Sequence, residues 1–113
     1  MKHDRLEKMV KGWFVGAFSP TSHLTEACEV AVKQYCAGEK ESAHHHKVAT
    51  EVTLVLSGEV RMMGRTWRDG DIITLNPGEI TDFEAITDAV TVVVKTPSIA
   101  GDKYLADAVL FDD

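Results

Sequence analysis

Alternating apolar and polar positions dominate the middle of the chain and predict an all-β protein. One run, "EVTLVLS" at 51–57, is almost continuously apolar, which is typical of a strand buried on both faces. Glycine-containing turn signals separate the runs at intervals of about 8–12 residues, as in a small barrel or sandwich whose interior has room for one small ligand. Strands are expected over 29–36, 51–57, 59–64, 65–69, 71–76, 81–85 and 90–96, with a tight turn at Met63–Gly64 between the third and the fourth of them.

The two ends of the chain are less regular than its middle. Apolar side chains at helical spacing predict a short helix within residues 4–10. The apolar segment "GWFVGAF" at 12–18 is broken by glycine and suits an edge strand or a segment laid across a sheet. The tail "GDKYLADAVLFDD" at 101–113 is compatible with a short helix and with an added strand. The length of 113 residues indicates one domain, 1–113.

The chain is acidic, with a formal net charge of −6. Basic side chains on phosphates supply most of the affinity of nucleic-acid-binding proteins. We therefore expect no nucleic acid and no anionic membrane as partners. The sequence contains no apolar window of roughly 18–20 residues and no apolar core of a secretory signal, which favours a cytoplasmic protein.

The two cysteines fit a reducing compartment. Cys28 and Cys36 delimit one predicted strand, which separates them by roughly 26 Å and puts a disulfide out of reach. Free, mostly buried thiols are expected.

Three adjacent histidines, His44, His45 and His46, stand shortly before Glu51. Side chains of extended chain alternate between two faces, so His44 and His46 should point one way and His45 the other. If the strand that begins at Glu51 pairs with the histidine segment, its carboxylate completes a two-histidine, one-carboxylate metal site with open ligand positions. A solvated polar loop is the competing interpretation, and the spacing alone leaves both open.

The stretch "GEKESAHHHKVATEVTLVLSG" resembles the first motif of the cupins, a superfamily of double-stranded β-helix (jelly-roll) barrels. In that motif, His-x-His and a glutamate lie at fixed spacings between two glycines. Gly38, His44, His46, Glu51 and Gly58 match these positions. The resemblance implies a divalent transition metal, iron, manganese, nickel or zinc, on the two histidines and the glutamate.

The second cupin motif is only partly present in "GDIITLNPGEITDFEA". Gly70 and Gly78 align, but the proline stands one place late. Thr81 occupies the position of the fourth metal ligand, a histidine in many cupins, and a hydroxyl is a poor ligand unless deprotonated. Glu79 or Asp82 is a possible substitute, although Asp82 should point outwards in a regular strand. A three-ligand metal, a substitute carboxylate, and metal-free acid–base or ligand-binding histidines therefore stay open.

The resemblance covers about residues 25–98 and extends to small bacterial single-domain cupins of the cupin 2 type, through "EITDFEA" and "KTPS…DKYL". It implies binding of, or action on, a small organic molecule, with dioxygenase, isomerase or decarboxylase chemistry. The alternatives are a non-catalytic module for a metal or small ligand and a metal-free sugar-type isomerase or epimerase. Small cupins are commonly dimers, so we expect a homodimer, with the termini available for its contacts.

Aromatic side chains are candidates for the wall of an internal cavity. Trp13 and Trp67 suit a ring-shaped ligand, although core or dimer packing is the commoner role for such residues. Phe83 shares strand parity with Thr81, and the Tyr35 hydroxyl can face a substrate. The sequence has neither a Ser-His-Asp arrangement nor a glycine-rich phosphate loop.

Overall fold

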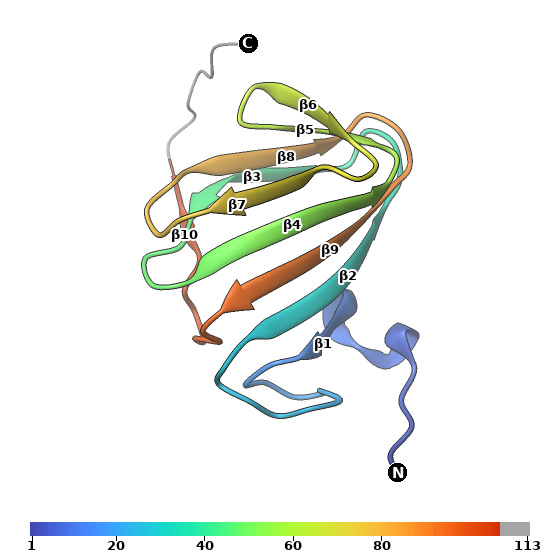
Figure 1. Cartoon of the computed structure of the whole chain (residues 1–113), viewed down its shortest axis with the longest axis vertical. Coiled ribbons are helices and arrows are strands. Elements are labelled where there is room, and N and C mark those ends of the chain that lie inside the picture. Colours follow the sequence, from blue (N-terminus) through green and yellow to red (C-terminus); the bar gives the residue numbers. More distant parts are fainter. Residues whose placement is uncertain (107–113) are drawn as a thin grey trace.

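The computed structural model describes residues 1–106 and consists of two antiparallel five-stranded sheets that face each other (Figure 1). One sheet has the order β1-β2-β9-β4-β7 and the other β10-β3-β8-β5-β6. The strands are β1 (Trp13–Val15), β2 (Glu29–Tyr35), β3 (Lys40–His45), β4 (Thr50–Ser57), β5 (Glu59–Met62), β6 (Arg65–Arg68), β7 (Ile72–Leu75), β8 (Thr81–Ala85), β9 (Ala89–Thr96) and β10 (Tyr104–Leu105).

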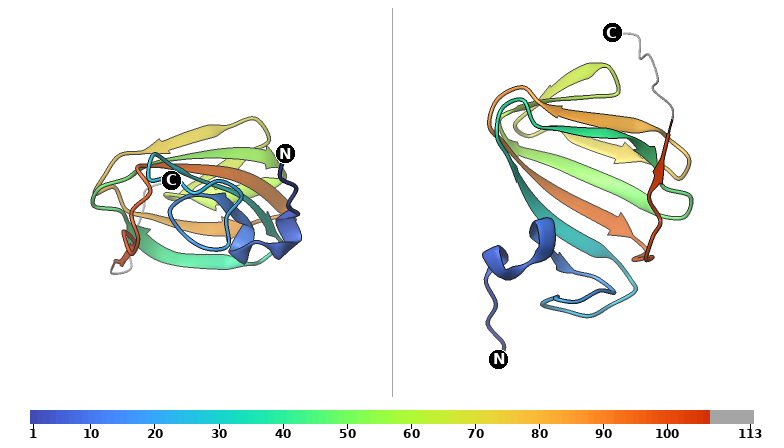
Figure 2. Two further views of the ribbon diagram at one scale, coloured as in Figure 1. Left: turned by 90° about the horizontal axis from the view of Figure 1, so that it is seen from below. Right: turned by 180° about the vertical axis from the view of Figure 1, so that it is seen from behind.

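The chain passes repeatedly from one sheet to the other. Apart from the β5–β6 hairpin, each strand from β3 to β10 lies in the sheet opposite to that of its predecessor. This winding produces a double-stranded β-helix, so the predicted fold class is confirmed (Figure 2). The seven predicted strands are all present, with ends within about two residues of the predicted ones, the scatter expected of strand boundaries.

The β5–β6 hairpin has the tight turn that the sequence indicates. Met63 and Gly64 connect the strands with φ values of 56° and 71°. Positive φ at both central residues matches the right-handed twist of the flanking strands, because it is the geometry of a type I′ turn.

Strand β4 is buried on one face only, so the prediction of burial on both faces is wrong. Its inward residues Glu51, Thr53 and Val55 are buried, whereas Val52 and Leu54 are half-buried. Leu56, the next outward residue of the strand, is 56% exposed. An antiparallel sheet can leave one face to solvent, and here a run of apolar residues forms that outer face.

Short elements before β2 and after β9 extend the barrel. The expected short helix is present as two three-residue 3₁₀ turns, η1 (Leu6–Lys8) and η2 (Val10–Gly12), and β1 is an edge strand on β2. From the tail, β10 pairs with β3; residues 107–113 lie outside the described residues. Within residues 1–106 no helix is long enough to cross a bilayer.

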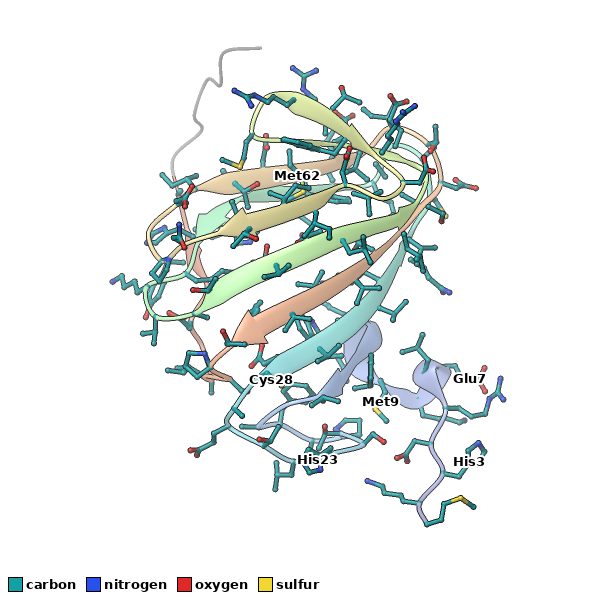
Figure 3. All side chains as sticks on the ribbon, viewed as in Figure 1. His3, Glu7, Met9, His23, Cys28 and Met62 are labelled. Carbon is teal, nitrogen blue, oxygen red and sulfur yellow. The ribbon has the colours of Figure 1, made fainter. Side chains whose placement is uncertain are left out.

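The cysteines lie just outside strand β2. Cys28 precedes the strand and is half-buried, and Cys36 follows it and is exposed (Figure 3). Both are free, as predicted, but the prediction of mostly buried thiols is wrong for Cys36. Its position at the end of β2 leaves it in a turn rather than between the sheets.

An apolar cluster fills the space between the sheets around the end of β4 and the start of β9. Met62 is one of its members and lies between the two sheets in Figure 3. Towards the other end of β4 the interior becomes polar, and the site described next lies there. The buried residues of the cluster are Val55, Val60, Met62, Ile73, Leu75, Phe83, Ala85 and Ala89.

Candidate metal centre and its cavity

His44 and His46 are buried, and their rings lie near each other at the end of β3. The ring centroids are 5.4 Å apart in an edge-on arrangement. His45 is only half-buried and stacks on Tyr104 of β10. The predicted alternation, with His45 on the opposite side, is therefore present in the structure.

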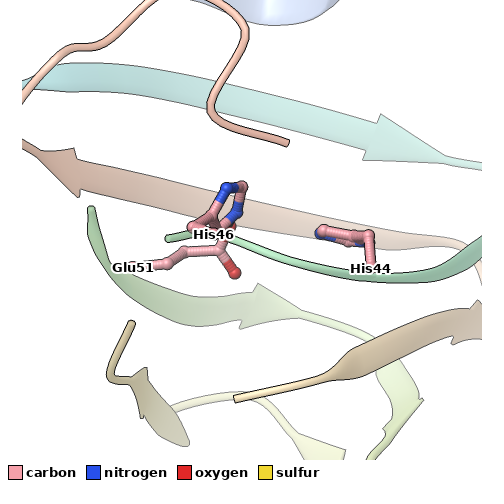
Figure 4. A group of neighbouring side chains, drawn as sticks. All are labelled: His44, His46 and Glu51. Atoms are coloured by element: carbon pink, nitrogen blue, oxygen red, sulfur yellow. The ribbon is translucent and has the colours of Figure 1, made fainter. Parts of the chain in front are cut away.

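Glu51 approaches the histidines from the opposite sheet. Strand β3 pairs with β8 and β10, and β4 pairs with β7 and β9, so the pairing that would have brought Glu51 beside the histidine segment is not formed. The three side chains meet instead across the barrel interior (Figure 4). One potential ligand atom from each of the residues His44, His46 and Glu51 lies within 4.8 Å of the others.

Backbone carbonyls orient both histidine rings. The Nδ1 atom of His44 donates to the Ser42 carbonyl at 3.0 Å, and Nδ1 of His46 donates to the Asp102 carbonyl. A carbonyl oxygen only accepts hydrogen bonds, so each Nδ1 carries the proton. In the neutral rings the lone pair is then on Nε2, the tautomer that second-shell partners usually impose on metal-binding histidines.

Burial and mutual contacts set the protonation states of His44, His46 and Glu51. Burial lowers the pKa of His44, so its ring is neutral near pH 7. The side-chain hydrogen bond to Glu51, 3.3 Å from His46 Nε2 to Oε1, raises the pKa of His46 against the effect of burial. Burial alone would raise the pKa of Glu51, but the hydrogen bond and charge of His46, with Lys95, lower it. Because Nδ1 of His46 also donates, the bond from Nε2 to Glu51 makes His46 an imidazolium paired with the carboxylate, beside the neutral ring of His44.

Thr81 lies beside the group but its hydroxyl points elsewhere. It is the cross-strand neighbour of His44, and its Oγ1 donates to the Asp82 carbonyl at 2.8 Å. The carboxylates of Glu79 and Asp82, the two possible substitutes for the fourth ligand, accept hydrogen bonds from backbone amides. The exposed Glu79 accepts from the Asn76 amide at 2.9 Å, and Asp82 accepts from the Met63 amide at 3.3 Å.

Asp102 supports the centre and was missed in the sequence. Its carboxylate accepts the amides of the turn between β3 and β4, at 2.9 Å from Lys47 and Ala49 and 3.2 Å from Val48. Its carbonyl holds His46. These backbone hydrogen bonds lower the pKa of Asp102, although burial acts in the opposite direction and is the largest single effect. The only local signal was a Gly-Asp pair in a tail of unassigned structure.

A cavity of about 250 Å³ adjoins the candidate metal-binding group. His44 and Glu51 line it, together with the aromatic residues Trp13, Tyr35 and Phe83. Phe83 and Tyr35 are packed together with centroids 4.4 Å apart. Three of the four aromatic candidates therefore reach the cavity. The fourth candidate, Trp67, packs against the apolar cluster and donates its indole hydrogen to the Met62 carbonyl.

Four lysines also line this cavity: Lys11, Lys33, Lys95 and Lys103. None was singled out from the sequence. Two of them had a signal, because Lys33 and Lys95 stand at inward positions of β2 and β9, where the alternation otherwise places buried residues. The other two come from the irregular ends of the chain, whose positions alternation does not predict.

No family model and no curated protein matches the sequence. Solved structures do match. An uncharacterised conserved protein with a double-stranded β-helix domain from Klebsiella pneumoniae has a TM-score of 0.68 and 25% identity, over 74% of each chain.

Two structures with stated activities are more distant in sequence. A sugar phosphate isomerase of the cupin superfamily from Silicibacter pomeroyi has a TM-score of 0.63 and 21% identity, over 73% of this chain and 58% of that one. Oxalate decarboxylase from Bacillus subtilis, a protein with Mn(II) centres, has a TM-score of 0.59 and 17% identity, over 71% of this chain and 24% of that one. With the strand winding described above, these similarities show that the chain has the double-stranded β-helix fold that cupin structures share.

Proposed function

We propose that this chain is an enzyme that holds a divalent transition metal on His44, His46 and Glu51 and acts on a small organic molecule in the adjoining cavity. The observation that carries the proposal is the donor set. Two imidazoles, each with Nδ1 bound to a carbonyl, and one carboxylate converge as three potential ligands, one fewer than the four of a closed structural zinc site. Iron, manganese, nickel and zinc all accept imidazole nitrogen together with carboxylate oxygen.

A metal at such a site supplies Lewis-acid polarisation of a substrate oxygen or activation of bound water. The protein itself provides the surroundings. Burial of the group keeps bulk water out, and the Phe83 and Tyr35 rings form an apolar wall. The Tyr35 hydroxyl donates to Glu41 at 3.2 Å, and burial raises its pKa far above the usual value. Tyr35 therefore acts as a hydrogen-bond donor and not as a base. Isomerisation, decarboxylation and dioxygenation are the reaction classes that we propose to screen.

A metal-free acid–base isomerase is the second candidate, and one observation favours it. His46 and Glu51 form a hydrogen-bonded pair at 3.3 Å, an arrangement of the kind that acid–base catalysis uses. His44 lines the cavity with an unprotonated Nε2, so it is the histidine available to accept a substrate proton. A ligand-binding module without turnover would use the same cavity.

The homodimer and the cytoplasmic location expected from the sequence stay predictions.

Elemental analysis by mass spectrometry of the untagged, purified chain tests the metal proposal. The test variant is His44→Ala/His46→Ala, and the matched control is His45→Ala, which removes a neighbouring imidazole from the opposite face. We expect near-stoichiometric transition metal in the parent and in the control and none in the double variant. Circular dichroism shows whether each variant is folded.

The absence of metal from all three proteins after reconstitution with each of the four metals would refute the metal proposal. Acid–base isomerisation with His44 as the base would then become the leading function. Equal metal in the parent and the double variant would show that the ion binds elsewhere.

A further inference from the structure

The cavity is rich in positive charge although the chain as a whole is acidic. Four lysines line it, against three carboxylate residues, whereas the formal net charge of the chain is −6. Lysines from the N-terminal segment, from two strands of one sheet and from the turn before β10 converge there. The lysines are Lys11, Lys33, Lys95 and Lys103, and the carboxylates are Glu41, Glu51 and Asp82.

We propose that this cavity binds a small organic anion, with its acidic group held by the lysines and the rest of the molecule directed towards His44 and Glu51. The inference deepens the proposed function and rests on it only in taking this cavity as the substrate site. It names the substrate class, a carboxylic acid or a phosphate ester.

Lys33 and Lys95 are unusually buried for lysines. Their side chains are 17% and 16% exposed, and buried ammonium groups are costly unless they are paired. Their partners are loosely placed, with Glu41 Oε1 at 3.6 Å from Lys33 and Glu29 Oε1 at 3.8 Å from Lys95. Both distances exceed the usual range of a charge-assisted hydrogen bond, about 2.7–2.9 Å, and each ammonium has three donors. Capacity to bind a further acceptor therefore remains.

The indole ring of Trp13 brings these two ammonium groups together. Lys33 Nζ lies 5.2 Å and Lys95 Nζ 4.8 Å from its centroid, so both cations lie against the same ring. Burial is the main reason why the pKa of Lys33 is lowered, and the positive charges of Lys103 and Lys95 lower it further. An anion bound among these lysines would reduce this mutual repulsion.

Lys11 reaches the cavity through a strained backbone. Its φ is 51°, in the left-handed region that non-glycine residues seldom occupy, and no hairpin turn explains it, unlike the other such residue, Met63. The next residue, Gly12, has φ 82°, and a Cβ there would lie 1.9 Å from the Val32 carbonyl oxygen. The N-terminal segment is thus pressed against β2 with Lys11 at the cavity. Strain of this kind is often concentrated at ligand sites.

The volume limits the size of the ligand. The cavity has about 250 Å³, below the roughly 300–1,000 Å³ of sites for drug-sized molecules. A short-chain acid or a small phosphate ester fits this volume. The competing explanation is that the lysines only balance Glu29 and Glu41 as structural ion pairs.

Anion titrations of the full-length, metal-stripped chain separate the two explanations. Inorganic phosphate and malonate are the probes for phosphate and carboxylate groups, and glucose is the neutral control. The readout is Trp13 fluorescence in a Trp67→Phe background, which leaves one tryptophan. Calorimetric titration of the parent protein provides a second measurement that does not depend on that background.

The test variants are Lys33→Met, Lys95→Met and Lys103→Met. The matched control is Lys40→Met, which removes an exposed lysine of β3 that does not line the cavity. We expect at least one anion to bind and each test variant to weaken it about tenfold, as loss of a hydrogen bond to a charged group does. The control should stay within about twofold. Lys103 is exposed, so its variant retains the fold even if a buried one does not.

Three results would overturn the inference. One is no binding of phosphate or malonate up to about 10 mM, a concentration that detects even weak millimolar sites. Another is anion binding that is equal in the parent and in the three test variants. The third is tighter binding of glucose than of either anion. Because the titrations use metal-stripped protein, their failure is independent of the metal content that tests the proposed function.

Discussion

The two ends of strand β4 differ in chemistry although they belong to the same wall of the barrel. The inward residues change from Glu51 through Thr53 to Val55 along its length. Around Val55 the interior is a closely packed apolar cluster, whereas around Glu51 it holds histidines, lysines and a cavity. The alternation that defines the strand is the same throughout, so alternation indicates which residues face inwards but not what they do there.

The difference shows where stability and binding capacity reside. The apolar end removes hydrocarbon from water and thus contributes free energy of unfolding. The polar end buries charged groups whose desolvation offsets their mutual attraction, so it adds little net stability. We therefore expect substitutions at the polar end to weaken metal binding with little effect on stability. Substitutions at the apolar end should lower stability with little effect on metal binding.

The largest expected effect is on metal binding in Glu51→Gln. The substitution keeps the side-chain volume but removes the only carboxylate of the proposed ligand set. Affinity for the bound metal should fall at least about 100-fold, more than the loss typical of a second-shell change. Competition with a chromophoric chelator measures it. Unchanged affinity in Glu51→Gln would place the metal elsewhere.

The next largest effect is on stability, at the other end of the same strand, in Val55→Ala. The side chain is fully buried in the apolar cluster. Loss of its methyl groups and the resulting cavity should lower the free energy of unfolding by about 2–3 kcal/mol, or Tm by roughly 10 °C. Urea denaturation measures the change. Metal affinity should stay as in the parent. A loss of metal affinity together with stability would show that the two ends of β4 do not act independently.

Asp102→Asn should affect both properties, to a smaller extent. The carboxylate accepts the amides of the turn that leads from His46 into β4, and an amide group cannot accept all of them. We expect a loss of about 1.5–2 kcal/mol in the free energy of unfolding and a metal affinity lowered by 10-fold or somewhat more.

The stability difference between parent and Asp102→Asn should depend on pH in a defined direction. The pKa of Asp102 is lowered in the folded state, so its contribution is fully present above the unfolded value of about 3.9. It is lost as the pH falls through the folded pKa. The difference in free energy of unfolding should thus be constant from pH 7 to about pH 5 and shrink below about pH 4. A difference that grows towards low pH would contradict this assignment.

The smallest expected effect is in His45→Phe. Nδ1 of His45 is buried without a hydrogen-bond partner among residues 1–106, and the ring stacks on Tyr104. Phenylalanine keeps the stacking and removes the unpaired nitrogen. The free energy of unfolding should therefore be unchanged or rise by at most about 1 kcal/mol, and Tm should change accordingly. Differential scanning calorimetry measures it. A marked loss of stability would contradict this expectation.

Much of the fold was predictable because it depends on local features. The period of two identified the strands, and the tight turn lies at Met63–Gly64, where the sequence predicts it. The same parity placed His44 and His46 on one side of the chain. The motif that resembles the cupins identified Glu51 as a candidate ligand, but Glu51 reaches the histidines across the barrel and not through pairing of β3 with β4.

The sequence by itself determined which side of each strand faces the interior and which residue types stand there, since alternation is a property of neighbouring residues. Only the tertiary structure decided that Glu51 meets the histidines from the opposite sheet, that Asp102 holds His46, and that lysines from four separate segments share one cavity. These arrangements depend on contacts between residues far apart in the chain. The order of strands in the two sheets, which local patterns do not specify, creates them.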